Sequence, residues 1–139
     1  MKLTLHHINI AGEDVAEMDK FYENVLLQGP IPEADALPAL DDNTVRVPVA
    51  FRYDGAIQFH LAKPDPQAGA RQHQRINPLA KGHIAFRTDD IEAYKAHLEA
   101  NGIEYADYGT TFTQGWYQIF FLDPGGTVIE VHQVLDQGA

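Results

Sequence analysis

The feature that most restricts how this chain can fold is a pattern that occurs twice, 76 residues apart. The spacing follows by subtraction, because His83 minus His7 and Asp90 minus Asp14 both give 76. Around each histidine, polar and apolar residues alternate, which predicts a strand, and a helical pattern follows each strand. A constant spacing through strand, loop and helix indicates an internal repeat, and therefore two halves related by a pseudo-two-fold axis.

Each half is predicted to contain a strand, a helix and then two or three further strands. Asp14 and Asp89, each followed by a glutamate three residues later, are expected to cap the two helices. The apolar stripe of the first helix extends to Leu26, and the second helix is expected to end at Asn101-Gly102. Asp54-Gly55 predicts a hairpin turn. The predicted strands are 3–10, 45–53, 56–61, 82–86, 105–111, 116–122 and 127–133, and the predicted loops are 30–44 and 63–81.

Composition excludes several classes of function. The chain has 139 residues and a formal net charge of −10, which disfavours binding to nucleic acid and to anionic membrane surfaces. It has no cysteine, so a metal would have to be held by histidine and carboxylate. No apolar run approaches the roughly 18 residues of a membrane span, and no signal peptide is recognisable at the start. We therefore expect a cytoplasmic protein.

The repeat predicts where the chemistry lies. His7 and His83 occupy the polar faces of matching strands, which should converge near the axis. The last strand of each half offers a second match, with His60 and Glu130 each between two apolar residues, at an offset of 70. Three histidines and one glutamate on a concave sheet face suit a single divalent ion of Fe, Mn, Co, Ni or Zn. Such an ion can bind a substrate directly and polarise its carbonyl group.

Strand alternation assigns further side chains to this face. His132 shares the face of Glu130, whereas His6 should point away from His7 and serve a structural role. Chemistry at such a metal generally requires a base, for which His60 and Tyr117 are the candidates. Gln58 competes with His60 as the fourth ligand. The predicted substrate pocket consists of Asn9, Gln58, Trp116, Gln118 and Phe120.

Together these segments resemble the vicinal-oxygen-chelate superfamily, which includes glyoxalase I, methylmalonyl-CoA epimerase, extradiol dioxygenases and bleomycin-binding proteins. The resemblance covers nearly the whole chain, in the family's order. The segments that carry it are Leu5-His6-His7-Ile8-Asn9-Ile10, Phe21-Tyr22-Glu23-Asn24-Val25-Leu26, Gln58-Phe59-His60-Leu61, Gly82-His83-Ile84-Ala85-Phe86, and the stretch from Phe120 to Val131.

The resemblance implies an α+β fold in which two tandem βαβββ modules form an open, curved, mixed β-sheet barrel around a metal. The expected modules are residues 1–62 and 82–135 of a single domain (1–139), joined by the loop 63–81. His7, His83 and Glu130 match the three ligands most often shared by metal-using members. His60 matches the fourth position, which is a glutamate in bacterial-type glyoxalase I. The resemblance also implies a homodimer.

The function expected on these grounds is a divalent-metal-dependent, glyoxalase-like enzyme with lyase or isomerase chemistry on a small, oxygen-chelating substrate. One alternative is an Fe(II) ring-cleaving dioxygenase. Another is a non-catalytic protein that binds a drug or metabolite, as bleomycin-resistance proteins do, although the bleomycin-binding members lack the metal ligands that this chain keeps.

Overall fold

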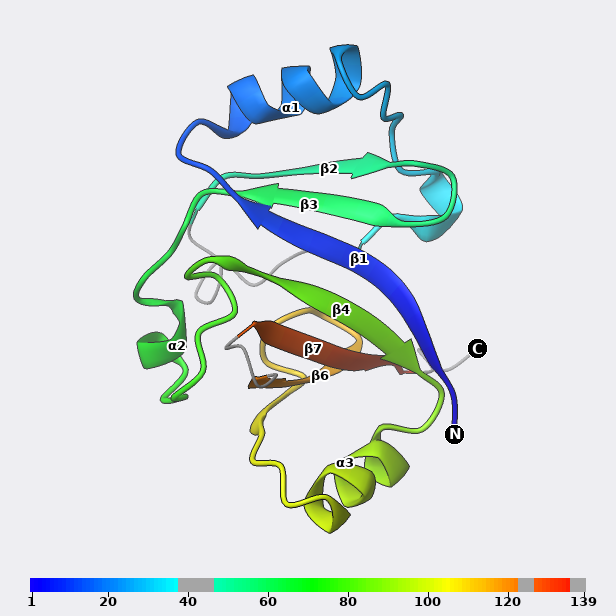
Figure 1. Cartoon of the computed structure of the whole chain (residues 1–139), viewed down its shortest axis with the longest axis vertical. Helices are drawn as coiled ribbons and strands as arrows, with labels where there is room; N and C mark the ends of the chain where they lie inside the picture. Colours follow the sequence, from blue (N-terminus) through cyan, green and yellow to red (C-terminus); the bar gives the residue numbers. More distant parts are fainter. Residues whose placement is uncertain (38–46, 123–126, 136–139) are drawn as a thin grey trace.

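The computed structural model of the chain describes residues 1–37, 47–122 and 127–135. A single mixed sheet of seven strands has the order β2-β3-β1-β4-β7-β6-β5. Figure 1 shows this sheet curving between α1 at one end of the molecule and α3 at the other. The strands are β1 (Leu3–Ala11), β2 (Val49–Tyr53), β3 (Gln58–Ala62), β4 (Gly82–Thr88), β5 (Ala106–Gly109), β6 (Trp116–Leu122) and β7 (Val128–Val134). The helices are α1 (Val15–Asn24), the 3₁₀ turn η1 (Glu33–Asp35), α2 (Ala68–Arg71) and α3 (Ile91–Ala100).

The strand pairing confirms the repeat. β1 and β4 are antiparallel neighbours at the centre, and Ile8 pairs directly with Ile84, which is 76 residues further along the chain. The pseudo-two-fold axis therefore passes between these two residues. On either side of it, β1 pairs in parallel with β3, and β4 pairs in parallel with β7. The predicted α+β fold with an open, curved, mixed sheet is confirmed.

The pairing also confirms the offset of 70 between the outer strands. His60 on β3 pairs with Asn9 on β1, and Glu130 on β7 pairs with Ala85 on β4. Asn9 and Ala85 themselves differ by 76, so His60 and Glu130 occupy equivalent places in the two halves. Both halves therefore direct one strand residue with a metal-binding side chain to the same face of the sheet.

The two long helices begin at aspartate caps. The side chain of Asp14 accepts a hydrogen bond from the amide of Glu17 at 3.0 Å, as predicted. In the second half the cap is Asp90, which accepts from the amide of Ala93 at 3.0 Å, so the prediction of Asp89 was wrong by one residue. Asp90 is the residue that the 76-residue offset from Asp14 singles out.

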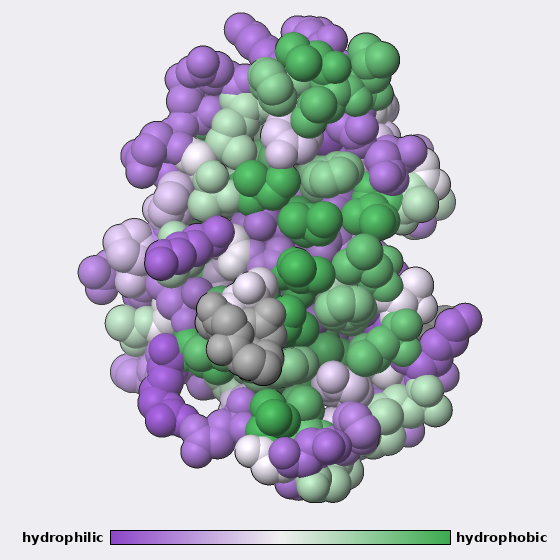
Figure 2. Space-filling view, in the orientation of Figure 1, coloured by the Kyte–Doolittle hydropathy of each residue, from purple (hydrophilic) through white to green (hydrophobic). Residues whose placement is uncertain are grey.

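The first helix is shorter than predicted. α1 ends at Asn24, and Leu27 adopts a left-handed φ of 58°, which stops the helix. Val25 and Leu26 therefore leave the predicted apolar stripe and are exposed. Figure 2 shows apolar side chains gathered on the surface at this end of α1, where Phe21 is also exposed.

The connections match the predictions in part. The hairpin between β2 and β3 turns at Gly55, whose φ of 105° suits glycine, and Asp54 Oδ1 accepts the amides of Ala56 and Ile57. The segment 63–81, predicted as a loop, contains the single turn α2. Much of the predicted loop 30–44, and the turn at 123–126, lie outside the described residues. No helix in the described ranges is long and apolar enough to cross a membrane.

The sheet has two chemically different faces, as the alternation predicts. On its outer face, Ile119 and Val131 are fully buried against Ile91, Tyr94 and Leu98 of α3. Burying each such aliphatic side chain stabilises the fold by roughly 1.5–3 kcal/mol. The inner face instead carries buried polar side chains, which include His7, His60, His83, Gln118, Glu130 and His132. A rigid apolar layer thus supports a polar cluster on the concave side.

Candidate metal centre

Three nitrogen and oxygen atoms converge at the centre of the concave face. They are Nε2 of His7 on β1, Nε2 of His83 on β4 and Oε1 of Glu130 on β7, and these side chains are almost completely buried. The separations are 3.0 Å between His83 and Glu130, 3.4 Å between the two histidines, and 3.6 Å between His7 and Glu130. The central position of β1, β4 and β7 in the sheet fixes all three backbones.

These separations fit a divalent ion. Ligand atoms about 2.0–2.2 Å from a metal lie roughly 3.0–3.5 Å apart when the angles between them are octahedral or tetrahedral. Two imidazoles and one carboxylate leave further coordination positions for a substrate. The structure therefore brings together three of the four predicted ligands, His7, His83 and Glu130.

Hydrogen bonding orients His83 as a ligand. Its Nδ1 lies 2.8 Å from the carbonyl oxygen of Pro78, which can only accept, so Nδ1 carries a proton, and in the neutral tautomer Nε2 presents its lone pair. That lone pair faces Glu130 Oε1 at 3.0 Å. Two acceptors at this distance repel one another unless a proton or a metal ion lies between them. The donor set therefore calls for a cation.

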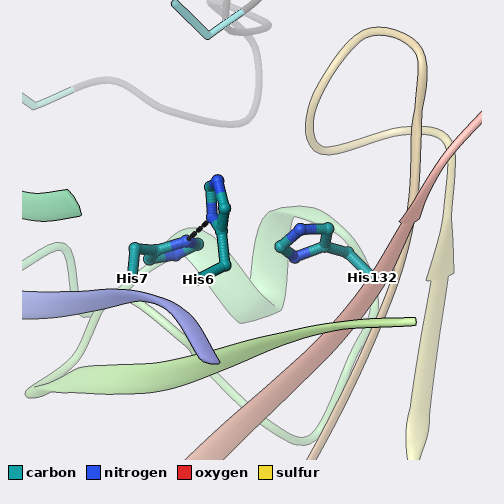
Figure 3. Close-up of side chains that lie close together, drawn as sticks. All are labelled: His6, His7 and His132. Carbon is teal, nitrogen blue, oxygen red and sulfur yellow. Dashed lines mark hydrogen bonds between the residues drawn. The ribbon is translucent and has the colours of Figure 1, made fainter. Parts of the chain in front are cut away.

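A β-bulge brings His6 to the same face as His7. Leu5 pairs with Phe86 and His7 with Ala85, so His6 is the extra residue of a register shift in β1. Figure 3 shows the rings of His6 and His7 side by side, with His132 beyond them. The expectation that His6 points away from His7 was therefore wrong, because strand alternation does not hold across a bulge.

Arg87 joins this second group of imidazoles to the ligands. Its Nε donates to His132 Nε2 at 2.9 Å, so His132 Nδ1 donates to Glu130 Oε2 at 2.6 Å. Its Nη2 lies 3.0 Å from His6 Nε2, and His6 Nδ1 lies 2.8 Å from His7 Nδ1. The protonated guanidinium makes the cluster of His6, His7 and His132 unsuitable for a second metal. The cluster instead forms an outer hydrogen-bonded shell that orients the candidate ligands His7 and Glu130.

Burial determines the charge of the centre. Burial lowers the pKa of His7 to about 4, against the opposing attraction of Glu130, and it lowers the pKa of His6 to about 2. Burial alone would raise the pKa of Glu130, but the attraction of His7 and the hydrogen bond from His132 hold it well below its usual range. At neutral pH the centre therefore contains a buried carboxylate beside the neutral imidazoles of His6 and His7, which is costly without a cation.

His60 lies beside the three converging ligands, not among them. Its ring stacks on that of His7, with centroids 3.8 Å apart, and its Nε2 donates to Gln58 Oε1 at 2.8 Å. Gln58 in turn donates to the backbone oxygen of Asp35. The pKa of His60 lies well below its usual range, chiefly because the ring is buried and secondly because His7 lies beside it. His60 is thus a neutral imidazole whose Nδ1 has no hydrogen-bond partner in the described residues.

A small pocket opens over the centre. Of the predicted pocket residues, Asn9, Trp116 and Gln118 line it, whereas Gln58 borders a neighbouring hollow and Phe120 packs behind His83 in the core. Within the described ranges, Gln118 Oε1 is buried and has no hydrogen-bond partner. A buried carbonyl without a donor is rare, and this one can accept a hydrogen bond from water or from a bound molecule.

Residues 4–131 match the family described as the Glyoxalase/Bleomycin resistance protein/Dioxygenase superfamily. The chain belongs to this superfamily. Members of the glyoxalase superfamily often bind a divalent metal, which agrees with the donor set of the centre. No curated protein matches the chain in sequence.

Solved structures share the glyoxalase-superfamily fold. A hypothetical protein from Bacillus halodurans C-125 is 20% identical with a TM-score of 0.69, covering 100% of this chain and 99% of its own. Methylmalonyl-CoA epimerase from Mycobacterium tuberculosis is 20% identical with a TM-score of 0.63, covering 96% and 89%. The Streptomyces coelicolor epimerase, in complex with 2-nitronate-propionyl-CoA, is 20% identical with a TM-score of 0.61, covering 97% and 100%.

Tyr117 does not lie at this glyoxalase-type centre. It is on the outer face of β6, where its hydroxyl donates to Asp107 Oδ2 at 2.7 Å and accepts from Lys95 Nζ at 3.0 Å. Strand alternation already separates Tyr117 from Trp116 and Gln118, so the prediction of Tyr117 as a base is corrected. Pocket residues that the sequence analysis missed are Leu37, Val49, Phe51, Leu79, Phe112 and Thr113. Most of these are ordinary apolar residues, for which the sequence carries no distinguishing signal.

Proposed function

We propose that this protein is a divalent-metal-dependent, glyoxalase-like enzyme that performs lyase or isomerase chemistry on a small substrate with metal-chelating oxygens. The observation that carries the proposal is the convergence of His7, His83 and Glu130 within 3.0–3.6 Å beneath a pocket. The ion, when bound, would supply Lewis acidity that polarises a substrate oxygen.

The surrounding residues have definable tasks in this proposal. His132 and the Pro78 carbonyl hold Glu130 and His83 in their orientations. Trp116 and the other apolar walls exclude water, and the unpaired amide of Gln118 orients the substrate by accepting a hydrogen bond. His60 is the proposed base, because its Nε2 proton is held by Gln58 and its Nδ1 is left to accept a proton.

The structural neighbours support the isomerase part of the proposal. Two of the neighbours named above are methylmalonyl-CoA epimerases, and epimerisation is an isomerase reaction. A base beside a Lewis acid is the arrangement that removes a proton next to a carbonyl group. We therefore expect isomerase assays on small carbonyl compounds, including acyl thioesters, to be the most informative first screen.

A second candidate is Fe(II) ring-cleaving dioxygenation. It is favoured by the ligand set, because two histidines and one carboxylate with open positions are the ligands of non-haem Fe(II) oxygenases. Oxygen uptake with Fe(II) and catecholic substrates would identify this activity. Isomerase or lyase turnover with Mn, Co, Ni or Zn and no oxygen uptake would instead identify the glyoxalase-like activity proposed above.

Elemental analysis of protein purified without a histidine tag tests the metal centre. We expect about one divalent ion per chain in the wild type and in His97→Ala, which removes an exposed histidine of α3. His83→Ala should lose the ion. A wild type that takes up no metal after incubation with Fe(II), Mn, Co, Ni and Zn would contradict the proposal. It would favour a non-catalytic binding protein with aromatic pocket walls.

A further inference from the structure

Arg87 is a cation without a carboxylate. Of the arginines that the structure describes, Arg52, Arg71 and Arg75 each lie within 4.0 Å of an aspartate or glutamate oxygen. Arg87 is half-buried, and in those same residues no carboxylate lies within that distance of it. Its neighbours are two neutral imidazoles and the face of Trp116, 5.1 Å from the guanidinium carbon. Burial accordingly lowers the pKa of Arg87.

The guanidinium keeps a free donor edge. A guanidinium has five N–H groups, and Arg87 uses its Nε proton for His132 and one Nη2 proton for His6. The Nη1 protons and the second Nη2 proton have no acceptor in the part of the chain that the structure describes. Together they form the planar end of the group, which matches the two oxygens of a carboxylate.

A second hollow lies at Arg87, next to the pocket over the candidate metal centre. Trp116 lines both cavities. The polar residues of the hollow are His6, Tyr53, Gln58, Arg87 and Asp35, and its apolar residues are Ala34, Ala36, Ala56, Trp116 and Val134. It thus offers one cation and small apolar walls beside it.

We infer that this hollow is a binding site for a carboxylate group, held by the free edge of Arg87, with a short hydrocarbon portion against the alanines and Trp116. Asp35 is exposed and carries the one acidic side chain on the described wall. Its charge, with the net charge of −10, disfavours a phosphate dianion relative to a monoanionic carboxylate. That the bound carboxylate belongs to the substrate rests on the proposed function, whereas the anion site itself does not.

Trp116 provides the assay because it is the single tryptophan of the chain. Its fluorescence is recorded while metal-free wild-type protein is titrated with acetate, propionate, phosphate or chloride at constant ionic strength. We expect saturable changes with the two carboxylates, with half-saturation in the low millimolar range, and weaker binding of phosphate. Changes no different from those with chloride would overturn the inference, without any need for a variant.

Two variants localise the site. Arg87→Gln should weaken carboxylate binding about 10- to 100-fold, the usual effect of losing charge-assisted hydrogen bonds. Arg75→Gln, at an exposed arginine paired with Glu104, should bind as the wild type does. Equal binding by wild type and Arg87→Gln, the latter with an unchanged circular dichroism spectrum, would overturn the inference. If the protein binds carboxylates but takes up no metal, the proposed metal-dependent function is refuted and the inferred carboxylate site stands.

Discussion

Glu130→Gln separates a metal centre from an ordinary buried ion pair. Glu130 is 1% exposed, and its two oxygens face His132 Nδ1 at 2.6 Å and His83 Nε2 at 3.0 Å. Glutamine has the same shape. Its amide oxygen can accept from His132, and its NH₂ group can donate to the lone pair of His83, which repels the carboxylate. Without metal, the substitution therefore removes a repulsion as well as a charge-assisted bond.

The magnitudes follow from these contacts. Losing the charge on the hydrogen bond from His132 costs about 1 kcal/mol, and the new bond to His83 returns about 1 kcal/mol. The metal-free free energies of unfolding should agree within about 1 kcal/mol. With metal at 100 times its Kd, the wild type gains about 2.7 kcal/mol. For a domain of this size that corresponds to a rise in Tm of roughly 8–10 °C. Glu130→Gln should show a rise of under about 2 °C.

The assay is thermal unfolding in chelator and in Zn, Mn or Co, with Glu104→Gln as the matched control. Glu104 is an exposed carboxylate paired with Arg75, so its removal should leave the metal-induced shift intact. If Glu130→Gln loses more than about 3 kcal/mol in chelator, Glu130 neutralises protonated histidines in a structural ion-pair network. Such a result would show that His83 Nε2 is protonated and presents no lone pair to a metal ion.

Three further outcomes are expected. His132→Ala should lower metal affinity about 10- to 100-fold, because it removes the hydrogen bond that orients Glu130. The affinity is measured by competition with a chelating dye. An unchanged affinity would show that His132 does not orient Glu130. Gln118→Leu should stabilise the metal-free protein by about 1 kcal/mol in urea unfolding, because it removes a buried carbonyl without a donor. A loss of stability would mean that the Gln118 amide is hydrogen-bonded in solution. Acid should destabilise the metal-free protein. The pKa of His7 falls from 6.5 to about 4 on folding, so the unfolded chain binds the extra proton, and the stabilisation present above pH 6.5 decreases by up to about 3 kcal/mol as the pH falls to 4. The lowered pKa of Glu130 acts in the same direction below about pH 4.5. A free energy of unfolding that stays constant from pH 7 to 4.5 would contradict the shift of His7.

Periodicity and the repeat were sufficient to predict the sheet and to place His7, His83 and Glu130, together with His60, on one face of it. His7 and His83 share the 76-residue offset, and strand alternation sets their faces. For His60 and Glu130 the offset of 70 gave the correct register across two loops of different length. These features are predictable because hydrophobic burial imposes the same period on every strand of a half-buried sheet.

Other features depend on details that periodicity does not contain. The bulge at His6 arises from one extra residue between two regular stretches, and nothing in the composition of Leu5-His6-His7 marks it. Arg87 was not singled out, because its role appears only when distant residues such as His6 and His132 meet it. α1 ends early because Leu27 adopts a conformation unusual for leucine.

The hydrogen-bond partners of His7 and His83, the two proposed histidine ligands, differ in how freely they can change during evolution. The partner of His83 is a main-chain carbonyl, that of Pro78, so no side-chain substitution deletes it. The partner of His7 is the side chain of His6, which a single codon change can replace. His83 thus has a hydrogen-bond partner that substitution cannot remove, whereas His7 has a side-chain partner that can vary. Position 6 is therefore where natural variation can change the hydrogen bonding of His7 without altering any of the proposed metal ligands.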